Sequence, residues 1–145
     1  RASGDNITAM LSLEMLGYFT DAPNTQKYPS PLSAFYPTTG NFIAFVANYD
    51  NRALVKQSVR AFRAGAQFPS EGAALPNFIR DVGRSDHWGF WKEGYRALMV
   101  TDTANFRNPN YHGPNDTPDT LDYDSMARVV EGLRAVLLDL ASPGN

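Results

Sequence analysis

The order of segments predicts an α/β fold, part of a mixed, mostly parallel sheet flanked by helices. Apolar runs over residues 7–16, 41–49 and 96–102 have the character of strands and alternate with helix-like segments. Strands that alternate with helices are typical of α/β layers. The chain has 145 residues, of which 43% are hydrophobic, so one domain with a real core is expected.

The first predicted strand is the run ITAMLSLEML over residues 7–16, which holds one charge, at Glu14. A continuous apolar run of this kind suits a strand that is covered on both faces. NFIAFVANY at 41–49 and RALMVTD at 96–102 are the other two strand candidates. Three strands make a thin sheet, so we expect an apolar strand edge that needs a partner.

A helix is predicted to follow the second strand and to run through about Ala64. Asp50 or Asn51 can cap its first turn, and Gly65 can end it. Its apolar residues recur at helical spacing. They are Leu54, Val55, Val59 and Phe62.

The last helix has the clearest signal. Asp122 is expected to cap it, and one apolar stripe runs along it. The stripe consists of Met126, Val129, Val130, Leu133, Leu137 and Leu140. A shorter helix is predicted over residues 86–93, with Ser85 as its N-cap and Gly94 after its end.

Long polar connections join these elements. Residues 20–40 hold four prolines, which exclude an interior helix or strand. A connection of this length in a compact domain is usually functional, so we expect it to form a wall or lid of a site. Residues 66–84 are predicted to be loop, with room for a short strand near residues 67–68, and residues 103–120 form another loop.

Composition excludes several classes of function. Thirteen Lys and Arg against fifteen Asp and Glu give a net charge of −2, which argues against binding nucleic acid or an anionic membrane. The absence of cysteine excludes disulfides, thiol nucleophiles and iron–sulfur clusters. No apolar run approaches the roughly 20 residues that span a bilayer. Neither a G-x-S-x-G elbow nor a phosphate-binding G-x-x-x-x-G-K motif is present.

Glu14 is an isolated carboxylate in an otherwise apolar strand, where burial carries a desolvation cost unless a cation or hydrogen bonds compensate. One interpretation is that Glu14 lies at the strand end and reaches water. Its neighbours Leu13, Met15 and Leu16 leave no solvent-facing side, which favours a metal-binding or catalytic role.

The chain has two histidines, His87 and His112. His112 lies in the loop after the third strand, and the carboxyl ends of strands are where α/β folds place their sites. Asp116 and Asp119 can form turns there or hold the imidazole by hydrogen bonds. The alternative is a loop histidine without a role.

The segment around Ser85, Asp86 and His87 supplies a hydroxyl, an acid and an imidazole. The helix dipole alone can explain an acid at this position, and aromatic residues such as Trp88 more often pack a core. Residue chemistry permits a mononuclear zinc site of His87, His112 and a carboxylate. No HExxH-like spacing fixes the two histidines together.

Three stretches stand in a fixed order. They are Ser12-Leu-Glu-Met-Leu-Gly17, then Gly83-Arg-Ser-Asp-His-Trp-Gly-Phe90 with Gly94-Tyr-Arg-Ala97, and Tyr111-His-Gly-Pro-Asn-Asp-Thr-Pro-Asp119. Together they resemble the co-catalytic di-zinc aminopeptidase family, which includes glutamate carboxypeptidases and the animal glutaminyl cyclases. The helix over residues 121–141 resembles the closing helix of that family.

The resemblance implies a zinc-exopeptidase fold with two zinc ions and a peptide substrate with a free N-terminus. Glu14 stands where the family has an Asp that binds one zinc, and is one methylene longer. His112 matches the histidine that binds the other zinc, with Gly113 in place of a family Thr. The resemblance also assigns supporting residues around the metals or the substrate pocket. These are Asp86, Ser85, His87, Tyr111 and Asp116.

The remaining ligands of the family, its bridging Asp and its general-base Glu precede the first of these motifs, whereas only Asp5 precedes Glu14 here. Residues 1–145 are therefore expected to be the C-terminal portion of a single zinc aminopeptidase catalytic domain, with no catalytic base. We expect the isolated chain to bind zinc weakly or not at all and to be inactive. Its expected partners are the missing N-terminal half or a second copy of the chain. Family resemblance favours a periplasmic or secreted location.

Three alternatives stay open. The chain can be a non-catalytic module that pairs through an uncovered sheet edge. It can be a glutaminyl-cyclase-like enzyme with a single zinc, which shares the Ser85-Asp86-His87 pattern. The third is the mononuclear site that uses His87.

Overall fold

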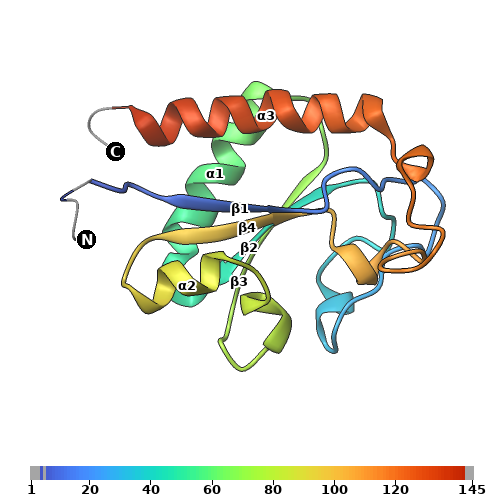
Figure 1. The fold of residues 1–145 in the computed structure, drawn as a ribbon, viewed down its shortest axis with the longest axis horizontal. Helices are drawn as coiled ribbons and strands as arrows, with labels where there is room; N and C mark the ends of the chain where they lie inside the picture. The colour runs from blue at the N-terminus through green and yellow to red at the C-terminus, as the bar shows by residue number, and fades with distance from the viewer. Residues whose placement is uncertain (1–3, 5, 143–145) are drawn as a thin grey trace.

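The computed structural model describes residue 4 and residues 6–142, and its centre is a four-stranded sheet with helices on both faces (Figure 1). The strands are β1 (Met10–Glu14), β2 (Ile43–Asn48), β3 (Ser70–Leu75) and β4 (Ala97–Thr101). The helices are α1 (Arg52–Gly65), α2 (His87–Lys92) and α3 (Tyr123–Ala141), with short 3₁₀ turns between them.

The sheet has the order β1-β4-β2-β3. β1 is parallel to β4 and β2 is parallel to β3, while β2 runs antiparallel to β4. The predicted mixed α/β sheet is confirmed. Because β1 and β4 are parallel neighbours, their carboxyl ends lie at the same end of the sheet, where the loops after both strands gather (Figure 1).

β3 corrects the predicted loop over residues 66–84. Its sequence, SEGAAL, holds residues of low strand propensity, so its pairing with β2 rather than its own composition makes it a strand. It begins at Ser70 and not near residues 67–68. A Cβ atom at Gly72 would lie 3.0 Å from Val55 and 3.1 Å from Val59, so glycine lets α1 pack close to this strand.

The start of α1 also differs from the prediction. A 3₁₀ turn over Tyr49–Asn51 precedes the helix, and the side chain of Asn48 accepts a hydrogen bond from the Asn51 N–H at 3.2 Å. Asn51 occupies the N-cap position of α1, as one of the two predicted candidates, but its side chain makes no capping hydrogen bond. The side-chain cap of the preceding turn comes from Asn48. The Asn51 side chain accepts the Ala97 N–H at 3.0 Å and thereby ties the turn to β4.

Of the predicted caps of α3 and α2, the first is confirmed and the second is wrong. Asp122 accepts the Ser125 N–H at 3.0 Å and caps α3 as predicted. Ser85 does not cap α2 through its side chain, because its hydroxyl group donates to Glu14. Asp86 occupies the N-cap position without a side-chain hydrogen bond.

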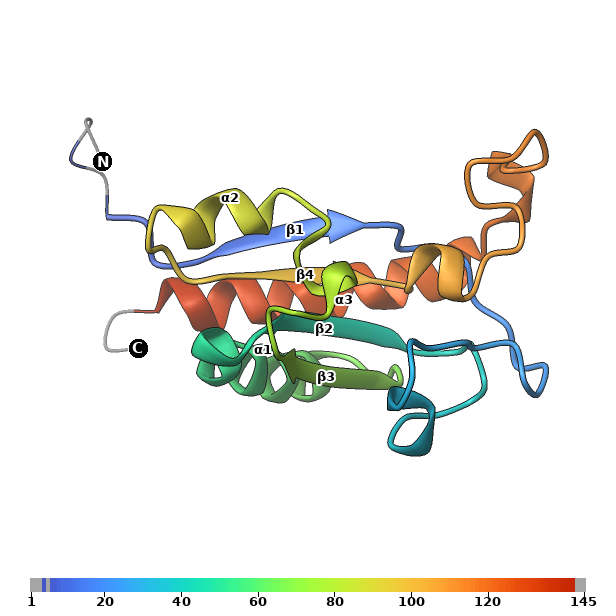
Figure 2. The ribbon, with the colours of Figure 1, turned by 90° about the horizontal axis from the view of Figure 1, so that it is seen from below.

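α1 and α3 pack side by side on one face of the sheet, and α2 lies on the other face (Figure 2). A buried hydrophobic cluster lies under α1 and α3 and includes Phe45, Phe62, Val100 and Val129. α3 buries Val129, Leu133, Val136 and Leu140. Val130 and Leu137, which were predicted in the buried stripe, are each 57% exposed, because the buried face is centred on the side of α3 that meets α1. None of the helices in the described residues is long and apolar enough to span a membrane.

The close approach of α1 and α3 predicts a strict requirement at Gly132. A Cβ atom there would lie 2.3 Å from the Phe62 ring, which is fully buried. We expect Gly132→Ala to lower the free energy of unfolding by about 1–3 kcal/mol through overpacking, measured by urea denaturation. Gly89→Ala is the matched control, because nothing lies within 4 Å of its Cβ position. A Gly132→Ala variant as stable as the control would contradict this packing.

Candidate functional site

A buried carboxylate joins the two loops at the end of β1 and β4. Asp102 is fully buried and follows β4. Its Oδ2 accepts the N–H groups of Gly17 at 3.1 Å and Tyr18 at 2.8 Å, and its Oδ1 accepts that of Ala104 at 3.0 Å. Burial raises the pKa of Asp102, and the N–H donors and the charge of Arg107 oppose this effect. The chain after β1 is therefore held against the chain after β4.

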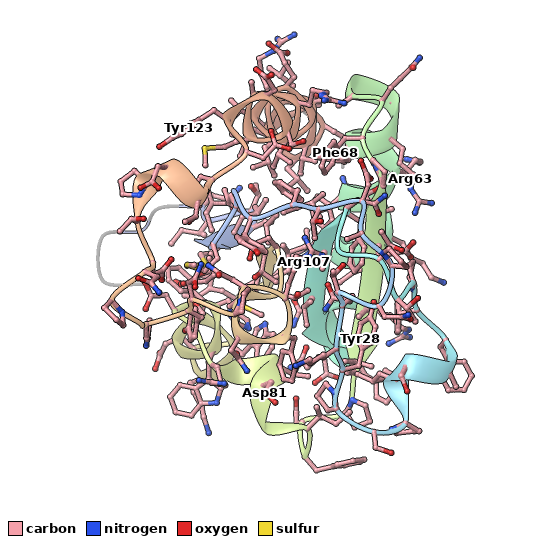
Figure 3. All side chains as sticks on the ribbon, turned by 90° about the vertical axis from the view of Figure 1, so that its right-hand side faces the viewer. Tyr28, Arg63, Phe68, Asp81, Arg107 and Tyr123 are labelled. Atoms are coloured by element: carbon pink, nitrogen blue, oxygen red, sulfur yellow. The ribbon has the colours of Figure 1, made fainter. Side chains whose placement is uncertain are left out.

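Arg107 extends this connection to the residue 20–40 loop (Figure 3). Its side chain is buried and donates to Gln26 Oε1 and to the Phe42 carbonyl, both at 2.8 Å. The guanidinium also lies 4.6 Å from the centre of the Phe42 ring, within range of a cation–π contact. Burial lowers the pKa of Arg107 to about 10, and the charge of Asp102 opposes this shift.

Glu14 ends β1 with a half-buried side chain. Its Oε1 accepts the hydroxyl groups of Ser12, at 3.2 Å, and of Ser85. The two serine hydroxyls are 2.6 Å apart, so they form one small network around this oxygen. Within the described part of the chain, no hydrogen bond reaches Oε2. Glu14 thus has one oxygen held in place and one available for a ligand.

His112 lies in the loop between β4 and α3 with an exposed side chain. Its ring stacks on Tyr111 at a centroid distance of 4.0 Å. The backbone N–H of His112 donates to Asp116 Oδ2 at 3.2 Å. The side-chain amide of Asn108 donates to the other carboxylate oxygen of Asp116 at 3.3 Å. Asp116 therefore shapes the loop, and neither imidazole nitrogen of His112 has a hydrogen bond within the described residues. Asp119 lies in the 3₁₀ turn at 118–120.

Left-handed backbone occurs directly after Glu14 and at His112 itself. Met15, which follows Glu14, has φ 56°, and His112 itself has φ 57°. Residues other than glycine adopt this conformation rarely, and such positions cluster at functional sites.

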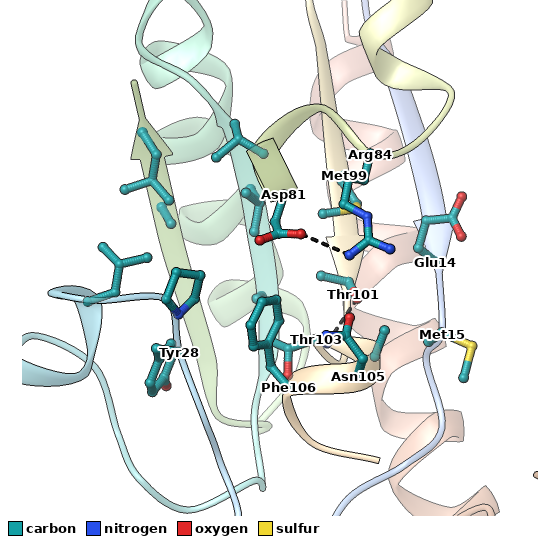
Figure 4. A pocket seen from close by; sticks show the side chains of 18 of the residues that line it. Glu14, Met15, Tyr28, Asp81, Arg84, Met99, Thr101, Thr103, Asn105 and Phe106 are labelled. Carbon is teal, nitrogen blue, oxygen red and sulfur yellow. Dashed lines mark hydrogen bonds and ion pairs between the residues drawn. The ribbon is translucent and has the colours of Figure 1, made fainter. Parts of the chain in front are cut away.

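Glu14, Ser85 and Tyr111 line one open pocket of about 180 Å³. Figure 4 shows part of its lining, with Glu14 on β1 and Tyr28 on the opposite side. The opposite wall of the pocket comes from the residue 20–40 loop, through Tyr28 and Tyr36, as the length of that loop predicted. Other lining residues are Ala44, Val46, Met99, Phe106, Asp81 and Arg84. Arg84 and Asp81 form an ion pair at 2.8 Å, which raises the pKa of Arg84 through a hydrogen bond and charge.

Two predicted site residues lie apart from this pocket. His87 is fully buried, with Nε2 2.7 Å from the Val82 carbonyl oxygen and its ring edge-on to Trp91. Burial lowers the pKa of His87. Asp86 is exposed. Neither residue lines the pocket, and the structure does not bring His87 into a shared cluster with Glu14 and His112.

The donor atoms at this end of the sheet can be compared with those of a zinc site. A carboxylate oxygen and an imidazole nitrogen are ordinary zinc ligands. Within the described residues no group of three His, Asp or Glu side chains could hold a metal ion. Glu14 and His112 are therefore the candidate donor side chains at this end of the sheet, one carboxylate and one imidazole.

Sequence reasoning missed the buried pair Asp102 and Arg107, and also the pocket residue Glu71. Asp102 carried a usable signal, because it is an acid directly after an apolar strand. Arg107 and Glu71 carried none, since each stands in a segment that was predicted to be loop.

The sequence of the chain matches a known peptidase family over most of its length. Residues 1–137 match the family model described as Peptidase family M28. The chain belongs to this peptidase family. The resemblance that the three motifs indicated is confirmed at this level.

Two individual relatives are similar to this M28 chain. The Escherichia coli K12 protein named "Uncharacterized protein YfbL" is 39% identical over 132 residues, which cover 90% of this chain and 41% of that protein. The crystal structure of the Legionella pneumophila LapA aminopeptidase matches with a TM-score of 0.65 at 20% identity, over 92% of this chain and 31% of that one. This second likeness supports the fold. The chain spans about two fifths of YfbL and about a third of LapA.

The lowered pKa of His87 predicts an acid-sensitive stability. Unfolded histidine gains a proton below about pH 6.5, whereas buried His87 resists protonation, so stability falls as the pH falls below this value. We expect His87→Gln to reduce the loss of Tm between pH 7 and pH 5, measured by thermal melting with chelator present. His112→Gln, which removes the exposed histidine, should keep the full loss. An unchanged pH dependence in His87→Gln would refute the effect.

Proposed function

We propose that this chain forms part of a zinc-dependent aminopeptidase site in which Glu14 and His112 each bind one of two zinc ions. The observation that carries the proposal is the free Oε2 of Glu14 on the rim of a pocket that Tyr111, the neighbour of His112, also lines. Membership of peptidase family M28 supports the reaction class.

The serine network gives Glu14 a defined orientation. Ser12 and Ser85 both engage Oε1, so the carboxylate cannot rotate without losing two hydrogen bonds. Oxygen atoms that are held in this way present the remaining lone pairs to a ligand in a fixed direction.

The loop around His112 also gives its imidazole a defined orientation. The Asp116 carboxylate holds its backbone, and the Tyr111 ring holds its imidazole plane. Bound zinc would supply Lewis-acid polarisation of the scissile carbonyl and a more acidic water. The pocket beside Glu14 would receive the side chain of the N-terminal substrate residue and exclude water from it.

This chain supplies neither a general base nor a bridging carboxylate in the proposal. One ligand for each ion is too few for a stable closely spaced pair of dications, whose mutual repulsion needs a shared anion. The proposal therefore assigns these groups to other parts of a longer protein, and the isolated chain is expected to be inactive.

A second candidate function follows from the exposed edge of β1. β1 is an edge strand whose Leu13 side chain is 54% exposed, and Leu137 of α3 is 57% exposed. Exposed strand edges with apolar residues invite pairing with another strand. A module that only pairs through this edge would form stable complexes without binding zinc.

The test uses the protein at its natural length. We expect Glu14→Gln and His112→Gln each to lower kcat/KM on leucyl-p-nitroanilide at least about 100-fold, because ligand loss removes transition-state stabilisation. Zinc content measured on the same samples should fall as well. Glu131→Gln is the control, since this glutamate is exposed on α3 and pairs with Arg134. Full turnover and full zinc content in both variants would exclude the proposed ligands.

A further inference from the structure

A single row of residues crosses the sheet on the pocket side. Glu14 on β1 pairs with Thr101 on β4, Thr101 pairs with Ala44 on β2, and Ala44 pairs with Glu71 on β3. All four residues line the pocket. Neighbouring strands lie about 4.8 Å apart, so the two glutamates stand roughly 14 Å apart along this row. A carboxylate therefore stands at each end of the pocket, with small side chains between.

The floor of the pocket between the two carboxylates is mostly apolar apart from Thr101. The next row of the sheet contributes Met99, Val46 and Ala73 to the pocket floor. Phe106 and Tyr28 add aromatic walls (Figure 4). Such a surface suits a chain of methylene groups, which gains free energy when it leaves water.

The charges of the pocket are unequally compensated. Its charged lining residues are Glu14, Glu71, Asp81 and Arg84. Asp81 and Arg84 pair with each other at 2.8 Å, and Glu14 is held by two serines. Glu71 is half-buried and has no hydrogen bond or ion pair within the described part of the protein. Glu71 is therefore the pocket carboxylate that can form an ion pair with a cationic group of a ligand.

Two tyrosines accompany Glu71 at this end. Burial raises the pKa of Tyr28 to about 12 and also raises that of Tyr36, and in both cases the negative charge of Glu71 adds to the effect. The Tyr36 hydroxyl donates to the Gly72 carbonyl at 3.2 Å, directly beside Glu71 in the chain. A carboxylate close to aromatic rings is a favourable environment for an ammonium or guanidinium group.

We propose that Glu71 is a specificity-determining residue that binds the cationic side chain of an N-terminal lysine or arginine. The proposal rests on the proposed function, because that function sets the scissile bond at the Glu14 end of the pocket. A lysine side chain spans roughly 6 Å over its five bonds of about 1.5 Å. The length of the lysine side chain and the length of the Glu71 side chain together cover most of the distance between the backbone positions of Glu14 and Glu71.

The same pocket disfavours substrates whose N-terminal side chain is apolar or acidic. An apolar side chain of equal length fills the same walls but leaves Glu71 facing methylene groups, without a partner for its charge. An acidic side chain meets the like charge of Glu71. Lysine and norleucine differ mainly by the charged group, so they form the most direct comparison.

The turnover test compares lysyl- and norleucyl-p-nitroanilide with the zinc-loaded protein at its natural length. We expect kcat/KM to favour the lysyl substrate about tenfold, which is typical of one hydrogen bond to a charged group. Glu71→Gln should remove this preference by lowering kcat/KM for the lysyl substrate, while Glu131→Gln, on the exposed face of α3, keeps the preference. A wild-type protein that hydrolyses both substrates equally overturns the role of Glu71 and leaves the proposed function intact.

A binding test separates the two proposals. Lysinamide and norleucinamide are titrated into the wild-type protein and the Glu71→Gln variant by calorimetry, which needs no turnover. Tighter binding of lysinamide that Glu71→Gln abolishes supports the role of Glu71, even where hydrolysis is absent and the proposed function fails. Equal affinity for both amides in the wild-type protein refutes it.

Discussion

Asp102 is a buried acid whose two carboxylate oxygens accept three backbone N–H groups from two separate loops. Gly17 and Tyr18 follow β1, and Ala104 follows β4. Without this carboxylate, three donors at the end of the sheet would lose their partner where little water reaches them, which is costly. The candidate site depends on this contact, because Glu14 stands just before one loop and His112 stands in the other.

The two faces of the sheet carry different tasks. α1 and α3 bury one face in a dense cluster around Phe45 and Phe62, which gives the strands a rigid support. The opposite face is only partly covered by α2 and carries the pocket. Loops that stand on such a scaffold can hold side chains in fixed positions while they remain open to a ligand. Arg107 adds the wall of the pocket to the same scaffold through Gln26 and Phe42.

Much of this architecture could be predicted from the sequence, because apolar runs and caps act locally. The three strong strands, the alternation with helices and the Asp122 cap were all found in this way. β3 could not be found, since SEGAAL becomes a strand only through its partner β2. Motif order was sufficient to indicate the peptidase family, although each motif alone was weak.

Residue-level details were less accessible where they depend on long-range contacts. Glu14 was noticed because a charge interrupted an apolar run, whereas Arg107 gains its role from Gln26 and Phe42, far away along the chain. The sequence also could not tell whether an imidazole points inward. His87 does so and binds the Val82 carbonyl, while His112 remains exposed beside Tyr111.

The central proposal is that Glu14 and His112 bind zinc at this end of the sheet. Crystals of the protein at its natural length, grown with zinc, allow anomalous scattering to be measured on both sides of the zinc absorption edge. The account predicts two zinc peaks, one at about 2 Å from the Glu14 carboxylate and one at about 2 Å from an imidazole nitrogen of His112. Zinc peaks that lie elsewhere and leave both side chains without a metal contact would contradict it.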